Sequence, residues 1–167
     1  MTEHATTPPV TTLSAGLGRL ERGLVVVAEN GVRPYGQSVR AGRHLLAADE
    51  PQPDGQDTGP GPYDLLLAAL GSCTSMTVRM YADRKGWPLD QVTVSLRHER
   101  VHAADRAECD NGNPGALVSR ITRRIRLDGD LDADQRRRLM EIAEHCPVHR
   151  TLTAGAVIST TEAPDQP

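Results

Sequence analysis

The chain has 167 residues and a formal net charge of −3, with 38% apolar residues, 2% aromatic residues and no phenylalanine. This length suits one domain with a sizeable core, which must be aliphatic because aromatic residues are so few. The mixed charges give no long-range attraction to nucleic acid or to an anionic membrane, so we expect neither as a partner. The longest uncharged helical stretch, residues 65–78, is shorter than the roughly 18 residues that a membrane-spanning helix needs.

The N-terminal residues 1–18 are expected to form a flexible tail. Residues 1–15 are rich in Thr and Pro, and they lack the basic start and the apolar stretch of a secretory signal. The chain has an odd count of three cysteines, which argues against a framework of structural disulfides. We therefore expect a cytoplasmic protein with reduced thiols.

Three short antiparallel strands are predicted for the first third of the chain. Residues 24–28 are a β-branched run that ends at the turn pair Asn30-Gly31. The partner strand is expected over residues 33–40, and a third strand over residues 43–48 after a turn at Ala41-Gly42. Residues 50–60 are rich in Pro, Gly, Asp and Gln and predict a loop.

A long helix is predicted from Pro62 to Lys85. Proline suits a first helical turn, and Gly86 before Trp87-Pro88 ends the helix. The glycine at position 71 lowers helix propensity by roughly 1 kcal/mol, which implies that another element approaches closely there. The neighbours of Cys73 at helical spacing are mostly apolar, so we expect Cys73 on the most apolar stripe of a buried helix; they are Leu66, Ala69, Leu70, Met76, Thr77 and Met80.

The second half of the chain predicts two strands, a helix and a final strand. Alternating apolar residues mark strands over residues 91–101 and 118–127, and a loop over residues 103–115 separates them. Asp132 is expected to cap a helix that runs to about residue 145, and residues 156–161 read as the last strand. The order β-β-β-α-β-β-α-β segregates strands and helices, which indicates an α+β fold.

Two smaller features of this half have plain interpretations. The basic stretch is interpreted as a solvated strand face; it consists of Arg120, Arg123, Arg124 and Arg126. Cys109 lies in the loop among Asp, Glu, Asn and Gly, and we expect it to be exposed and incidental.

Two cysteines stand in contexts that suggest thiol redox chemistry. Cys73 lies in the long helix, and Cys146 opens the sequence Cys146-Pro147-Val148-His149. A thiol reacts with peroxide as its thiolate, so it needs a positive partner, and a second cysteine can then resolve the sulfenic acid as a disulfide. The charges nearest to Cys73 along the chain are Asp64 and Arg79, so its partner must come from elsewhere in the fold.

Plainer interpretations remain open for both cysteines. Cys73 is alternatively an inert apolar residue of a buried helix, and Cys146 a residue that ends a helix before Pro147. A metal site is a further alternative, because zinc uses such ligands; the candidates are His98, His102, Cys109, His145, Cys146 and His149. No second closely spaced cysteine pair accompanies Cys146-x-x-His149, so we expect neither a metal nor a cofactor.

The two cysteine motifs together resemble the OsmC/Ohr family of osmotically inducible and organic-hydroperoxide-resistance proteins. The resemblance rests on Gly61-Pro62-Tyr63-Asp64-Leu65-Leu66-Leu67-Ala68-Ala69-Leu70-Gly71-Ser72-Cys73 and on Cys146-Pro147, and it runs from about residue 31 to residue 161. It implies a single OsmC-like domain over residues 19–163. It also implies an intertwined homodimer in which antiparallel sheets wrap two long central helices, with active sites at the interface.

The resemblance implies a peroxiredoxin-like enzyme of oxidative stress defence that reduces organic hydroperoxides with its thiols. Cys73 would be the peroxidatic cysteine, Cys146 the resolving cysteine, and a dithiol or lipoyl-type protein the reductant. The alternative is a non-catalytic protein of the same fold that binds a small molecule in an apolar pocket at the dimer interface.

The start of the long helix departs from the pattern of the family's peroxidases. In those proteins a Pro-Glu pair opens the central helix, and the Glu orients an Arg from the N-terminal region against the reactive thiolate. Here Pro62 is followed by Tyr63, and the acid comes one place later as Asp64. Tyr63 and Asp64 are therefore the candidate orienting residues, and the candidate activating arginines are Arg33, Arg40 and Arg43.

Overall fold

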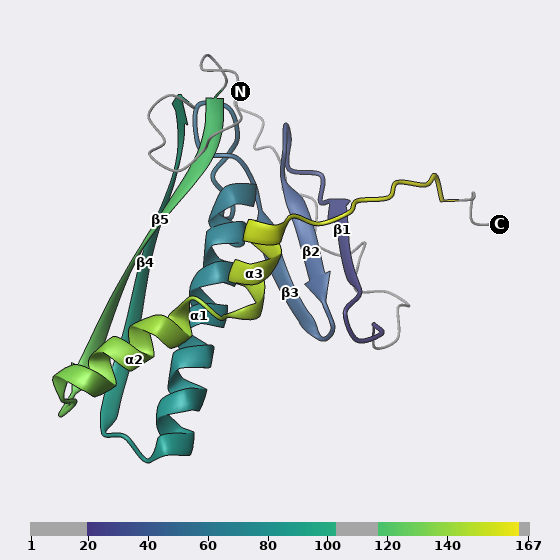
Figure 1. Ribbon diagram of the computed structural model, residues 1–167. Coiled ribbons are helices and arrows are strands. Elements are labelled where there is room, and N and C mark those ends of the chain that lie inside the picture. The colour runs from purple at the N-terminus through teal and green to yellow at the C-terminus, as the bar shows by residue number, and fades with distance from the viewer. Residues whose placement is uncertain (1–19, 103–116, 164–167) are drawn as a thin grey trace, which may run out of the picture. The chain divides into compact units, whose positions relative to one another are not determined.

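The computed structural model describes residues 20–102 and 117–163 (Figure 1). The chain divides into two compact units, one that ends at Leu66 and one that begins at Leu67. Strands precede and follow the long helix, and the mixed α+β class expected from the sequence is confirmed. The single domain expected over residues 19–163 stays a prediction. The expected tail and the loop that carries Cys109 lie outside the described residues.

The first unit contains a three-stranded antiparallel sheet, as predicted. Its strands are β1 (Val25–Glu29), β2 (Gln37–Ala41) and β3 (His44–Ala48), paired in that order. The connection from β1 to β2 is wider than the predicted tight turn. The side chain of Asn30 accepts a hydrogen bond from the N–H of Val32, and the N–H of Gly36 donates to the carbonyl of Val32. Gly42, with a φ of +60°, makes the tight turn between β2 and β3.

The predicted loop after β3 is organised around Asp49, which is 3% exposed. Its carboxylate accepts hydrogen bonds from the N–H groups of Glu50, Gln56 and Thr58 and from the Thr58 hydroxyl, at 2.8 to 3.2 Å. Burial raises the pKa of Asp49, but these donors outweigh burial and hold the pKa below its usual range. A single carboxylate thus satisfies several N–H groups of this loop.

The helix α1 (Pro62–Lys85) begins and ends where the sequence predicts. At its start, the N–H of Gly61 donates to Oδ2 of Asp64 over 3.1 Å. Gly86, with a φ of +64°, ends the helix. By length and composition alone, α1 is long and apolar enough to cross a membrane. One stripe of α1, however, belongs to the core of the second unit, which is typical of a helix packed inside a folded domain.

The buried stripe of α1 differs from the predicted stripe that contains Cys73. Met76 and Met80 are 69% and 62% exposed, and Cys73 is half-buried. The helix is almost uniformly uncharged around Cys73, so its pattern gives little contrast between faces. The buried residues are Leu70, Gly71, Thr74, Val78 and Ala82. Cys73 therefore lies beside the buried face, one position before Thr74.

The second unit packs α1 with a long hairpin and a second helix. The hairpin consists of β4 (Leu89–His102) and β5 (Leu117–Gly129), and the helix α2 (Ala133–Ala143) follows. The core cluster contains Val78, Ala82, Leu89, Leu127, Leu131, Leu139 and Ala143. A Cβ atom at Gly71 would lie 2.8 Å from Cδ1 of Leu96, which confirms the predicted close approach of another element. Leu96 belongs to β4.

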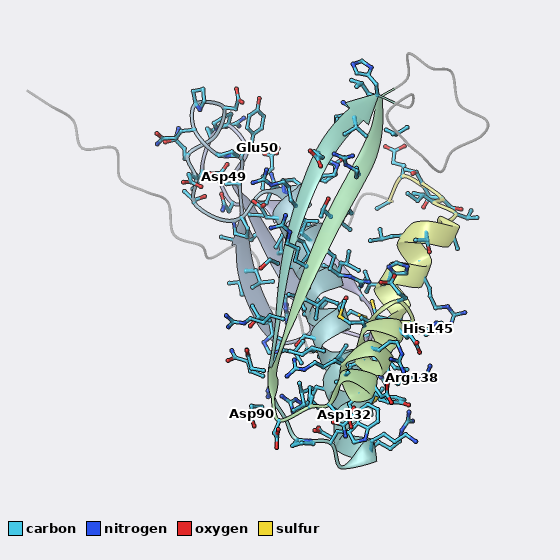
Figure 2. All side chains as sticks on the ribbon, turned by 60° about the vertical axis from the view of Figure 1, so that its left-hand side comes forward. Asp49, Glu50, Asp90, Asp132, Arg138 and His145 are labelled. Atoms are coloured by element: carbon cyan, nitrogen blue, oxygen red, sulfur yellow. The ribbon has the colours of Figure 1, made fainter. Side chains whose placement is uncertain are left out.

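The helix α2 has the cap that the sequence predicts. Asp132 accepts from the N–H of Gln135, and the Gln135 side chain accepts from the N–H of Asp132, which completes a capping box. Figure 2 shows Asp132 at the start of α2, with Arg138 and His145 further along the chain.

The C-terminal region differs from the prediction. A third helix, α3 (Pro147–Ala154), follows α2 directly. Residues 156–161 form no strand, and Val157 and Ile158 are 97% and 87% exposed. A strand needs a hydrogen-bonded neighbour, and within the described part of the chain these residues pair with none. The predicted last strand is therefore wrong for the chain by itself.

Candidate active site

Cys146 is fully buried at the start of α3. It is the N-cap residue, with Pro147 in the first turn, and its sulfur accepts a hydrogen bond from the N–H of His149 over 3.3 Å. The N-terminal end of a helix carries partial positive charge, which favours a thiolate over a thiol. The sulfur of Cys146 thus lies where negative charge is stabilised.

Thr74 of α1 contacts the same sulfur. Its Oγ1 atom lies 3.5 Å from Sγ of Cys146 and 2.8 Å from the carbonyl oxygen of Leu70. The side chain of Thr74 is completely buried. A buried hydroxyl needs hydrogen-bond partners, and Cys146 is one of them.

Arg123 of β5 reaches this hydroxyl with its guanidinium group. Nη1 donates to Oγ1 of Thr74 over 2.8 Å and to the carbonyl of Ala143 over 3.2 Å. Nη2 donates to Oε1 of Glu144 over 2.9 Å, and the side chain of Arg123 is only 9% exposed. The interpretation of this basic stretch as a solvated face is therefore wrong for Arg123. It holds for Arg120, Arg124 and Arg126, which are exposed.

The sequence contains a signal that singles out Arg123. Successive residues of a strand point to opposite faces, so residues two apart share a face. Arg123 shares its face with Ile121, Ile125 and Leu127, each of which is buried or half-buried. A charged residue in the apolar register of an alternating strand must find a partner inside the fold.

The two thiols interact, although both are free. Burial raises the pKa of Cys146, but hydrogen bonds from Thr74, from the N–H of His149 and from Cys73, together with the charge of Arg123, outweigh burial and lower the pKa overall. Cys73 is thus close enough to Cys146 to influence the ionisation of that thiol. Cys73 is half-buried, and Cys146 is fully buried with a lowered pKa.

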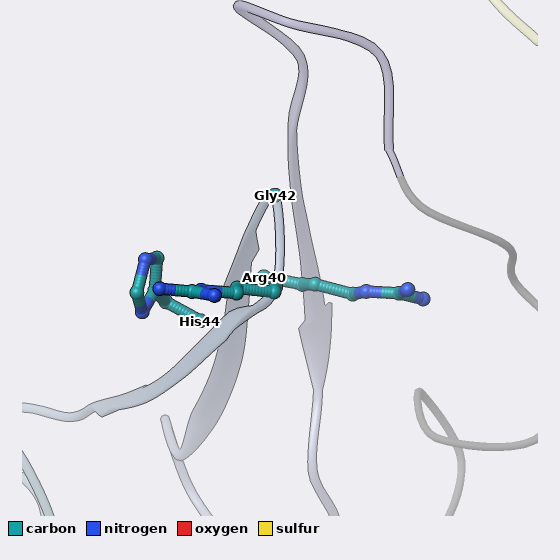
Figure 3. Close-up of a pocket in the computed structure, with 4 residues that line it drawn as sticks. Arg40, Gly42 and His44 are labelled. Carbon is teal, nitrogen blue, oxygen red and sulfur yellow. The ribbon is translucent and has the colours of Figure 1, made fainter.

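The three arginines predicted to activate Cys73 belong to the first unit. Arg33 lies in the loop between β1 and β2, Arg40 in β2, and Arg43 in the turn before β3. The last two line a pocket at that turn together with Gly42 and His44 (Figure 3). All three arginines belong to the first unit, whereas the contacts of Cys146 come from the second unit. Their activating role stays a prediction.

The candidate orienting residues lie in the first turn of α1. Tyr63 is 55% exposed. The Asp64 carboxylate accepts a hydrogen bond from the N–H of Gly61. This contact agrees with the simpler interpretation of Asp64 as a residue that stabilises the start of the helix. An orienting role for either side chain stays a prediction.

The alternative of a metal site finds no support in the described ranges. Within residues 20–102 and 117–163, no three His, Cys, Asp or Glu side chains form a group suited to a metal ion. His149 instead lies beside an acid, with its Nε2 atom 3.5 Å from Oε2 of Glu144. His98 and His102 belong to β4, and Cys109 falls outside the described residues.

Comparison with known proteins identifies the family. The sequence model of the family described as OsmC-like protein matches residues 55–161, which is more than half of the chain. The chain belongs to this family. The matched segment contains α1, the hairpin, α2 and α3, and with them both cysteines.

Solved structures of the same fold agree with this assignment. The OsmC-like protein from Mycoplasma pneumoniae is 17% identical, with a TM-score of 0.60 over 77% of this chain and 85% of that chain. An organic hydroperoxide resistance protein OsmC from Legionella pneumophila is 16% identical, with a TM-score of 0.55 over 77% and 88%. The organic hydroperoxide resistance protein OhrB of Bacillus subtilis is 17% identical, with a TM-score of 0.53 over 77% and 89%. A comparison with curated proteins found no significant match.

Proposed function

We propose that this protein reduces organic hydroperoxides with the thiols of Cys73 and Cys146. The observation that carries the proposal is that a half-buried Cys73 is one of the groups that lower the pKa of the buried Cys146. Two proteins of similar fold are named organic hydroperoxide resistance proteins, which supports the same chemistry here. A two-cysteine mechanism uses one accessible thiol and one resolving thiol, and we assign these parts to Cys73 and Cys146.

The reaction takes place in two thiol steps followed by a reduction. The Cys73 thiolate attacks one peroxide oxygen, the O–O bond breaks, and the alkoxide takes a proton and leaves as an alcohol. The sulfur of Cys73 is then a sulfenic acid, which Cys146 converts into a disulfide with loss of water. A dithiol or a lipoyl-type protein then exchanges with this disulfide and returns both cysteines to thiols. Such reductants fit a cytoplasmic location, which we propose for the protein.

The surroundings of Cys73 favour alkyl peroxides over hydrogen peroxide. Met76 follows Cys73 by one helical turn, Met80 follows by two, and both side chains are largely exposed in the single chain. Ala69 precedes Cys73 by one turn on the exposed side. An apolar surface beside the reactive sulfur binds an alkyl group better than it binds water-like hydrogen peroxide.

We further propose that the protein is a homodimer. Met76, Met80, Val157 and Ile158 leave large apolar side chains exposed in the single chain, and a second copy would cover them. Light scattering at micromolar concentration should therefore give twice the mass of one chain. A folded monomer under these conditions would contradict the proposed dimer.

A count of free thiols tests the proposed reaction. The reduced protein is mixed with one equivalent of cumene hydroperoxide per chain, then denatured, and its thiols are counted. We expect a loss of two thiols per chain, with one equivalent of cumyl alcohol formed. A protein that only binds small molecules would keep all three of its thiols. The same count with hydrogen peroxide should show a slower loss.

A further inference from the structure

The hydroxyl of Thr74 has three partners and a single proton. It lies 2.8 Å from the Leu70 carbonyl, 2.8 Å from Nη1 of Arg123 and 3.5 Å from Sγ of Cys146. The guanidinium only donates, so it occupies one lone pair of the oxygen. The proton of Thr74 therefore points either to the Leu70 carbonyl or to the sulfur of Cys146.

This arrangement gives the Cys146 sulfur and the Thr74 hydroxyl hydrogen-bond partners in both protonation states of Cys146. When Cys146 is a thiol, its S–H donates to the second lone pair of Thr74, and Thr74 donates to Leu70. When Cys146 is a thiolate, the hydroxyl turns and donates to the sulfur, while the guanidinium still donates to the oxygen. No heavy atom has to move between the two states.

The charge of Arg123 favours the thiolate. Its side chain is 9% exposed, while the side chain of its carboxylate partner Glu144 is 57% exposed. Glu144 pairs with Nη2, but Nη1 points to a neutral hydroxyl and a neutral carbonyl. A guanidinium with little access to water gains from a nearby anion, and the sulfur of Cys146 beyond Thr74 supplies one.

We propose that Arg123, acting through the hydroxyl of Thr74, is the positioning residue that keeps Cys146 as a thiolate, ready to attack the sulfenic acid of Cys73. The inference rests on the proposed function. In this step the Cys146 sulfur attacks the Cys73 sulfur, the S–S bond forms, and the S–O bond of the sulfenic acid breaks. Hydroxide leaves and takes up a proton to become water. Arg123 acts on the sulfur of Cys146 through Thr74, so we call it a positioning residue.

The first test measures the thiolate directly and needs no peroxide. In a full-length protein with Cys73→Ala and Cys109→Ser, Cys146 is the single thiol, and its ionisation is followed by the ultraviolet absorbance of the thiolate against pH. Arg123 is the charged group that lowers the pKa of Cys146, Glu144 pairs with both Arg123 and His149, and the N–H of His149 donates to the sulfur. The midpoint should lie below that of an ordinary thiol, near 8.5.

Variants of the network should move this midpoint in opposite directions. Arg123→Met and Thr74→Val should each raise it by about one unit, a tenfold change in the ionisation constant, because each removes stabilisation of the anion. Thr74→Ser keeps the hydroxyl, so its midpoint should equal that of the protein with Thr74. Glu144→Gln should lower it, since Arg123 then has one competing anion less.

The matched control is Arg124→Met, which removes the same charge from an exposed position of the same strand. It should leave the midpoint of Cys146 unchanged. A midpoint that stays the same in Arg123→Met and in Thr74→Val overturns the proposal. If Arg123→Met does not fold, Thr74→Val and Thr74→Ser decide the matter by themselves.

A second test follows the fate of Cys73 during oxidation of the protein with all its cysteines. With excess cumene hydroperoxide, mass spectrometry measures how much Cys73 becomes disulfide and how much becomes sulfinic acid. Arg123→Met should raise the ratio of sulfinic acid to disulfide about tenfold, because the resolving thiol is less ionised. An unchanged ratio contradicts the proposal. If Cys73 does not react with peroxide at all, the proposed function fails, and the titration still decides the role of Arg123.

Discussion

Replacing Cys73 with serine should reduce the consumption of cumene hydroperoxide by a thousandfold or more, since loss of a nucleophile leaves roughly the uncatalysed reaction. Cys146→Ser should behave differently. Without added reductant, it should consume about one equivalent of peroxide and keep Cys73 as a sulfenic acid, because no resolving thiol converts this acid into a disulfide. Consumption of one equivalent of peroxide per chain, followed over time without added reductant, distinguishes the two variants.

The matched control for these variants is Cys109→Ser, which should keep full turnover. The opposite pattern, with Cys73→Ser still reacting once and Cys146→Ser inert, would show that the roles of the two cysteines are reversed. Equal activity in all three variants would contradict any part for thiols in the reaction.

Leu139→Ala should lower the free energy of unfolding by about 2 to 5 kcal/mol, the usual range for a leucine truncated in a packed core. Leu139 is completely buried on α2 and belongs to the cluster with Val78 and Ala82 of α1. Removing it leaves a cavity between the two helices that carry Thr74 and lead to Cys146. Urea unfolding followed by circular dichroism measures the change.

The neighbouring substitution Met140→Ala is the control for this prediction. Met140 is 42% exposed, so its truncation should lower the free energy of unfolding by less than about 1 kcal/mol. Similar losses for the two variants would contradict the packing described for α2.

Local signals in the sequence predicted most of the helices and strands. Proline at position 62 and glycine at position 86 delimit α1, and Asp132 with Gln135 marks the start of α2. These signals act within a few residues of the chain, so they can be recognised without knowledge of the tertiary structure. The alternation of apolar residues likewise predicted β4 and β5, although it placed their ends short by a few residues.

The features that the sequence analysis missed depend on contacts between distant residues or on ambiguous signals. Pro147 was interpreted as the stop of one helix, whereas it occupies the first turn of the next helix, a position that proline also suits. This interpretation hid α3 and the N-cap position of Cys146. The segment 156–161 has the composition of a strand, but a strand also requires a neighbour. Composition cannot show whether that neighbour exists in the same chain.

Only part of the candidate site could be predicted, because the rest depends on contacts between residues that are distant in the sequence. Its two cysteines stand in motifs that resemble those of a known family, and this resemblance predicted thiol chemistry. Arg123 instead required attention to register, because its charge is unremarkable among the four arginines of this strand. Thr74 looked like an ordinary helix residue, and only the fold brings it to both Arg123 and Cys146.

The most direct test of the account is to map the linkage formed when the reduced protein is treated with one equivalent of cumene hydroperoxide. The oxidised protein is alkylated, digested without reduction and analysed by mass spectrometry. We expect a peptide pair joined by a disulfide between Cys73 and Cys146, with Cys109 alkylated. The two-cysteine mechanism is contradicted if Cys73 stays reduced, or if Cys73 is oxidised directly to sulfinic acid while Cys146 remains a free thiol.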